Sequence, residues 1–370
     1  MRCLSTNSGE LKSLRLGRFV SIVLAVAILS ILFVGCSPDK STKADEQQQN
    51  PMKIKIGFSM DTLVQERWLR DRDIFVARAN ELGAEVIVQS ANSDAYEQEK
   101  QAQYLIDQGI DVLVIIPHDA VKAAAIVKSA KDKGIKVISY DRLIRNAKCD
   151  LYVSFDNNKV GELMAQTLVN TVPTGNYLII NGSPLDNNSF MFNEGYMKVL
   201  SPYISNKKIT IVGEEWAMDW RYEVSFNFVE KELKDNTKID AIIAGNDTLA
   251  GAAIEALAET RAAGKIPVVG HDADLDGCQR IVEGTQLATI YKPINKIARA
   301  AADFAVKLAK NEKLEISDEI IDGKGLIPYY KIPPILVTKD NMYEVIIRDG
   351  FHKMEDVYMN VPKSKWPKEE

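Results

Sequence analysis

The chain has 370 residues, of which 46% are hydrophobic and 8% aromatic, and its formal net charge is −5. This composition is typical of globular proteins, and the length is enough for two ordinary domains. An acidic protein is not suited to holding nucleic acid, so we expect no nucleic-acid partner.

The first 35 residues have the features of a lipoprotein signal peptide. An apolar run at residues 19–35 follows the basic residues Lys12, Arg15 and Arg18. The run ends directly before Cys36. We expect Cys36 to carry lipid and residues 36–52 to form a disordered tether. The alternative is an uncleaved anchor, because the apolar run is close to the lower length limit of a spanning helix. Either way the rest of the chain is exported and held at the extracytoplasmic face of the cell membrane.

The segment that follows alternates short β-rich runs with longer amphipathic stretches. We expect strands at residues 54–58, 86–89, 112–116 and 135–140. Between the first two, Phe75 and Ala79 share one face of a predicted helix, and Gly109 ends the next helix. Repeated strand, helix and strand units indicate a parallel sheet covered on both faces.

A second α/β series begins after residue 170. Its predicted strands lie at residues 177–180, 209–212, 239–243, 268–269 and 288–291. Two series of similar size indicate two similar domains. Ligands of such sheets bind beyond the carboxyl ends of the strands, so the functional residues are expected there.

Polar and aromatic side chains recur where the predicted strands end. They are Arg67, Trp68, Asp141, Arg142, Asn188, Trp216, Trp220, Asn246, Asp272 and Lys292. Carboxylate, amide and guanidinium groups suit a polyhydroxyl ligand, and an aromatic face can cover the C–H side of a sugar ring. We expect Arg142 to neutralise Asp141, and its loss to impair binding rather than folding.

Each of these residues also has a simpler interpretation. Asp141 and Arg142 can form a surface salt bridge of little energetic value. Asn246 and Asp272 can cap helices. The tryptophans can be core residues, and Lys292 can be a solvated loop lysine. Their joint recurrence at strand ends favours a binding site.

The cysteines and histidines give no indication of a metal site. Cys149 and Cys278 lie far apart in sequence, and they either form a disulfide or are buried or free thiols. The three histidines are scattered, without the close spacings of zinc sites. We therefore expect no metal and no cofactor.

Four segments in order carry a resemblance to a known family. They are residues 66–73 (ERWLRDRD), 140–142 (YDR), 181–188 (NGSPLDNN) and 271–275 (HDADL). The chain closely resembles the D-xylose-binding proteins of bacterial ABC transporters, from about Lys53 to Phe351. The resemblance implies an α/β protein with the type I periplasmic-binding-protein fold, in which two Rossmann-like lobes are joined by three crossings and the sugar lies in the cleft between them. It implies no catalysis.

The resemblance also assigns residues to the lobes. The N-terminal lobe takes residues 53–155 and 294–327, and the C-terminal lobe takes 156–293 and 328–350, with a tail at 351–370 of unknown structure. The N-terminal lobe then supplies the ligand-binding residues Arg67, Trp68, Asp141 and Arg142, and the C-terminal lobe supplies Asn188, Trp220, Asn246, Asp272 and Lys292. Trp216 is not expected to contact the sugar, and His271 stands where an amide is expected.

The implied function is capture of D-xylose or a related aldopentose by cleft closure and delivery to an ABC permease with its ATPase. The alternative partner is a membrane sensor, such as a sensor kinase or chemoreceptor. A glycoside hydrolase is disfavoured, because carboxylates that alternate with cations suit hydrogen-bond acceptance better than acid catalysis. A sugar-responsive repressor would need a DNA-binding unit where this chain has an export signal.

Overall fold

The computed structural model describes residues 53–368, except for the side chain of Glu66. These residues form one compact unit. The predicted signal peptide, Cys36 and the tether lie outside the described residues. Among the residues described, no helix is long and apolar enough to cross a bilayer.

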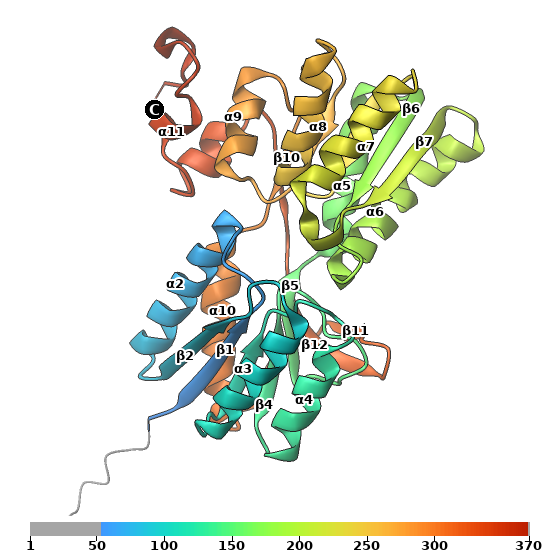
Figure 1. Ribbon diagram of the computed structural model, residues 1–370. Helices are drawn as coiled ribbons and strands as arrows, with labels where there is room; N and C mark the ends of the chain where they lie inside the picture. The colour runs from blue at the N-terminus through green and yellow to red at the C-terminus, as the bar shows by residue number, and fades with distance from the viewer. Residues whose placement is uncertain (1–52, 369–370) are drawn as a thin grey trace, which may run out of the picture. The chain divides into compact units, whose positions relative to one another are not determined.

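The first lobe is built on a seven-stranded sheet with the order β11-β12-β5-β4-β3-β1-β2 (Figure 1). Its strands are parallel except for the edge strand β11, which runs antiparallel to β12. The strands are β1 (Lys55–Met60), β2 (Glu85–Ser90), β3 (Val112–Ile115), β4 (Lys136–Tyr140), β5 (Leu151–Phe155), β11 (Glu319–Ile321) and β12 (Leu326–Ile332). Its helices are α2 (Glu66–Glu81), α3 (Ala95–Asp107), α4 (Ala123–Asp132) and α10 (Ile294–Ala309).

Helices cover both faces of this sheet because its strands are apolar on both sides. One core cluster joins the sheet to α2 and α10 and includes Phe58 and Phe75. A second joins the other face to α3 and α4 and includes Leu105 and Ile126. Asp94 begins α3 by accepting hydrogen bonds from the backbone N–H groups of two residues in its first turn.

The second lobe contains a four-stranded parallel sheet with the order β7-β6-β8-β9. Its strands are β6 (Gly175–Asn181), β7 (Ile209–Trp216), β8 (Ala241–Ala244) and β9 (Val268–Val269), and β10 (Thr289–Tyr291) pairs with β13 (Ile335–Val337) in a separate ribbon. Its helices are α5 (Asn157–Thr171), α6 (Asn187–Ser205), η1 (Met218–Trp220), α7 (Tyr222–Lys234), α8 (Asp247–Glu259) and α9 (Leu275–Glu283). The α/β fold class predicted from the sequence is confirmed.

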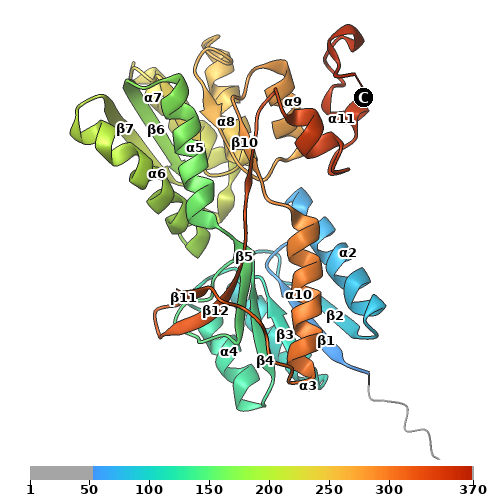
Figure 2. The same cartoon turned by 180° about the vertical axis from the view of Figure 1, so that it is seen from behind.

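The chain passes between the lobes at three places. It leaves the first lobe after β5, returns between β10 and α10, and leaves again after β12 (Figure 2). The predicted boundary at residue 327 is too early, because β12 pairs with β5 as far as Ile332 and so belongs to the first sheet.

The tail, which had no structure assigned, packs on the second lobe. It contains α11 (Met354–Val357) and η3 (Lys363–Lys365), and it follows η2 (Tyr343–Ile347) at the end of the second lobe. Val357 and Tyr358 join α9 in a small core that also buries Cys278, whereas the Cys149 thiol is buried in the first lobe. The two cysteines therefore lie in different cores.

Candidate functional site

One cavity between the lobes collects the side chains predicted from the strand ends. All nine predicted ligand-binding residues line it, namely Arg67, Trp68, Asp141, Arg142, Asn188, Trp220, Asn246, Asp272 and Lys292. Its volume is about 20 Å³, which is enough for a water molecule but not for a sugar ring. Among the described residues, no cluster of His, Cys, Asp or Glu is placed to hold a metal ion.

Four further residues line the cavity: Gln65, Asp186, Phe192 and His271. Phe192 lies one helical turn beyond Asn188 on α6, so helical spacing could have identified it. Gln65 precedes α2 and gave no signal in the sequence. Trp216 lies outside the cavity lining, and its ring packs 4.8 Å from that of Phe190.

Arg67 of the first lobe forms ion pairs with three aspartates. It lies in the first turn of α2, and its guanidinium contacts Asp141 at 2.7 Å, Asp71 at 3.3 Å and Asp272 of the second lobe at 3.3 Å. Burial opposes ionisation of Asp141, but Arg67 and Lys292 outweigh it and hold the pKa of this carboxyl below its usual range. Arg67 therefore organises carboxylates on both sides of the cavity.

Arg142 forms a second link between the lobes. It pairs with Asp61 of the first lobe at 2.6 Å and with Asp186 of the second at 2.8 Å. Asp141 and Arg142 are 2% and 4% exposed, so they are not a surface salt bridge. The expectation that Arg142 is the main cation at Asp141 is wrong, because Asp141 adopts φ +60° at the end of β4 and its carboxylate is held by Arg67.

The second lobe brings Asp272 and Lys292 together at 2.7 Å. Burial raises the pKa of Asp272, but Lys292 together with His271 and Arg67 outweighs burial and leaves this pKa well below its usual range. Asn188 donates to the backbone carbonyl of Asp141 across the cleft at 3.1 Å. Asn246 does cap α8, since its side-chain oxygen accepts from the backbone N–H of Leu249, and it also lines the cavity.

Aromatic rings also line the cavity, beside the charged groups. The Arg67 guanidinium lies 4.3 Å from the ring centroid of Trp68, which is buried. Trp220 packs directly on Gly182, where an added Cβ would lie 2.1 Å from the indole. Glycine at this position therefore gives Trp220 the space to lie along the cavity.

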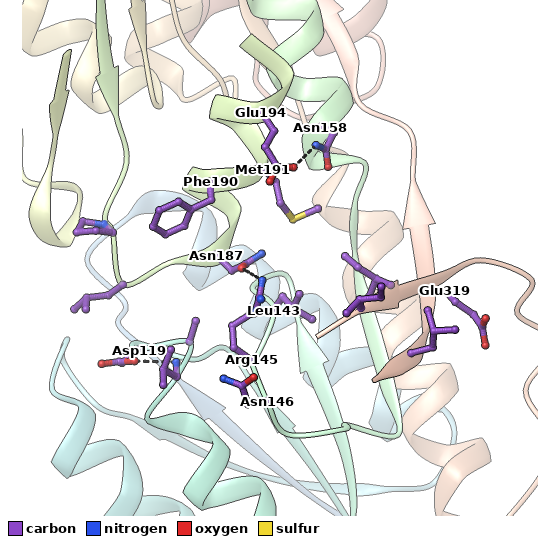
Figure 3. A pocket seen from close by; sticks show the side chains of 17 residues that line it. Asp119, Leu143, Arg145, Asn146, Asn158, Asn187, Phe190, Met191, Glu194 and Glu319 are labelled. Carbon is purple, nitrogen blue, oxygen red and sulfur yellow. Dashed lines mark hydrogen bonds between the residues drawn. The ribbon is translucent and has the colours of Figure 1, made fainter. Parts of the chain in front are cut away.

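Contacts at the rim of the cleft also join the lobes. The backbone N–H of Ala120 donates to the carbonyl of Leu185 at 2.9 Å, and Arg145 donates to Asn187 at 2.9 Å. Arg145 and Asn187 line a second, larger cavity, whose walls come from both lobes (Figure 3). The volume of this cavity is about 1000 Å³. The predicted ligand-binding residues lie outside this larger cavity, in the smaller one.

The arrangement suits an uncharged polyhydroxyl ligand. The cavity is lined by three cations, Arg67, Arg142 and Lys292, and by three carboxylates, Asp141, Asp186 and Asp272. Because every one of these cations is already paired with a carboxylate, a ligand needs no charge of its own. Charged side chains of both signs give strong donors and acceptors to hydroxyl groups.

The chain is similar to known proteins in sequence and in fold. Residues 56–313 match the family described as periplasmic binding protein domain. Over 306 residues the chain is 49% identical to the D-xylose-binding periplasmic protein of Haemophilus influenzae and 46% identical to that of Escherichia coli, covering 82% of this chain and 92% and 93% of those proteins. A carbohydrate transporter solute-binding protein from Chloroflexus aurantiacus, solved with D-glucose, is 30% identical with a TM-score of 0.76 and covers 82% of this chain and 98% of that one.

Proposed function

Because this chain belongs to the periplasmic binding protein family, a family of solute-binding proteins rather than enzymes, we propose that it captures D-xylose or a related aldopentose and delivers it to an ABC permease and its ATPase. The observation that carries the proposal is the charge-balanced cavity between the lobes, in a chain nearly half identical to proteins named for D-xylose binding. The nine residues predicted from the sequence, all of which line this cavity, are the proposed ligand-binding residues.

Sugar capture follows from the division of the site between two lobes. The sugar receives hydrogen bonds from both lobes only when they are closed, so it stabilises the closed form by its differential affinity. The ion pairs of Arg67 with Asp272 and of Arg142 with Asp186 already hold groups of the two lobes together. The closed form is then the shape that the membrane partner recognises.

Titration calorimetry against a panel of aldoses tests the substrate. We expect D-xylose to bind most tightly to a fragment that begins near Ala44, and D-glucose to bind roughly 10- to 100-fold more weakly, because its hydroxymethyl group needs extra room in a small cavity. D-xylonate should not bind, since its carboxylate would meet a cavity whose cations are paired. Tenfold tighter binding of ribose or galactose would show that the substrate is another sugar.

A membrane sensor is the alternative partner. Uptake of labelled xylose by cells that lack this chain separates the two functions. Loss of uptake supports the transporter. Normal uptake with loss of the transcriptional response to xylose supports the sensor.

Lipid attachment at Cys36 is part of the proposal. We expect the full chain to fractionate with membranes and its N-terminal peptide to begin at a lipid-modified Cys36, because each buried methylene group contributes about 0.8 kcal/mol. Cys36→Ser should release the protein into the soluble fraction without changing xylose affinity. Mass spectrometry of the mature N-terminus checks this, and an intact Met1 would indicate a spanning anchor instead.

A further inference from the structure

His271 is a buried residue of the cavity whose hydrogen-bonding groups are not used. It follows β9, is 2% exposed and lines the cavity beside Asp272. Neither ring nitrogen has a hydrogen-bond partner among the described residues. Nδ1 lies 3.3 Å from an Asp272 oxygen, but the geometry is not that of a hydrogen bond.

The same cavity contains a second buried group of this kind, Nε1 of Trp220. The other buried polar side-chain atoms without a partner in the described part of the chain belong to residues that do not line this cavity. Buried polar groups in folded proteins nearly always have partners, and an exception calls for an explanation. Two exceptions in one cavity indicate that its ligand supplies the partners.

The ring of His271 is neutral. Burial is the main cause, and the nearby Lys292 adds to it, so the pKa of His271 falls to about 4. A neutral imidazole has one nitrogen that donates and one that accepts. With the indole N–H of Trp220, the cavity offers two donors and one acceptor that the protein does not use.

The ring is also held in position. Its centroid lies 4.5 Å from that of Phe192 and 6.1 Å from that of Trp220, which itself packs on Gly182. His271 therefore cannot turn away to find another partner without disturbing both aromatic rings.

We propose that His271 is a specificity-determining residue whose neutral imidazole forms a hydrogen bond with one hydroxyl of the bound sugar. This inference rests on the proposed function, and it adds a recognition group to the nine residues expected from the sequence. A hydroxyl is the right class of partner because it can donate to the accepting nitrogen or accept from the protonated one. A hydroxyl carries no charge, which suits a cavity whose cations are already paired with carboxylates.

The test compares wild type with His271→Phe and His271→Gln. We expect His271→Phe to bind xylose roughly 3- to 10-fold more weakly, the usual value of a neutral hydrogen bond, and to have a higher melting temperature, because an apolar ring leaves no buried polar atom unpaired. His271→Gln keeps a donor and an acceptor and should retain most of the affinity. His352→Phe is the matched stability control. His352 is also buried, but Nε2 contacts the carbonyl of Ala273 at 2.8 Å, so its replacement should lower the melting temperature.

Monodeoxy analogues of xylose identify the hydroxyl. For the analogue that lacks the hydroxyl bound by His271, wild type and His271→Phe should have equal affinity, whereas the other analogues should keep the difference. If His271→Phe bound every analogue more weakly than wild type by the same factor, His271 would act through packing or a bound water molecule. The inference would then be wrong. If wild type binds xylose and His271→Phe binds it as tightly, the inference falls and the proposed function stands. If wild type binds no aldose, both fall.

Discussion

Arg67→Ala is expected to weaken xylose binding by roughly 100-fold or more and to lower the free energy of unfolding by about 3–5 kcal/mol. Arg67 is 95% buried and pairs with Asp71, Asp141 and Asp272. Its removal leaves these carboxylates buried without their shared cation, which destabilises the protein even before any sugar is added. Calorimetry measures the affinity, and urea-induced unfolding followed by circular dichroism measures the stability.

Arg72→Ala is the matched control on the same helix. Arg72 pairs with Asp73, whose side chain is 67% exposed, so the loss should be less than about 1 kcal/mol and xylose affinity should not change. If Arg67→Ala were as stable as Arg72→Ala, the buried ion pairs of Arg67 would not support the fold.

Arg142→Ala should impair closure as well as affinity. Removing Arg142 breaks the contacts with Asp61 and Asp186, so we expect binding to weaken by about 2–4 kcal/mol and the protein to remain open at xylose concentrations that close wild type. Small-angle X-ray scattering measures closure as a decrease in the radius of gyration. Contrary to the expectation from the sequence, stability should also fall, because Asp186 is buried.

Arg348→Ala is the control for this variant, because the pair of Arg348 with Glu344 is on the surface, with Arg348 70% exposed. It should close like wild type. Closure of Arg142→Ala at wild-type xylose concentrations would show that the contact with Asp186 is not needed to join the lobes.

The sequence predicted which residues line the cavity better than how these residues pair. Strand ends meet at one edge of a parallel sheet, so period and spacing were enough to place Asp141 at the edge of the first sheet and Asn246 and Asp272 at the edge of the second. The family resemblance implied that these two edges face one cavity. Pairing depends on backbone turns that spacing does not reveal. The positive φ of Asp141 is such a turn, and it assigns Asp141 to Arg67 rather than to its neighbour Arg142.

The supporting residues were missed for a related reason. Asp61 and Asp71 are buried carboxylates that hold the two arginines, but in sequence they look like ordinary polar residues after a strand and within a helix. The same holds for β12, whose residues do not reveal that it pairs with the distant strand β5, with Tyr329 beside Tyr152. Contacts between distant segments are set by the whole fold and not by local pattern.

The position of β12 has a consequence for the order in which the chain folds during synthesis. The ribosome produces β5 long before β12, so the sheet of the first lobe stays incomplete until Ile332 has emerged, when nine-tenths of the chain has been made. The second lobe is completed later still, by the segment around Tyr358. Contacts of such long sequence separation form slowly. We therefore expect neither lobe to reach its final structure before translation is nearly finished, and chains truncated before β12 to be recognised by proteases as unfolded.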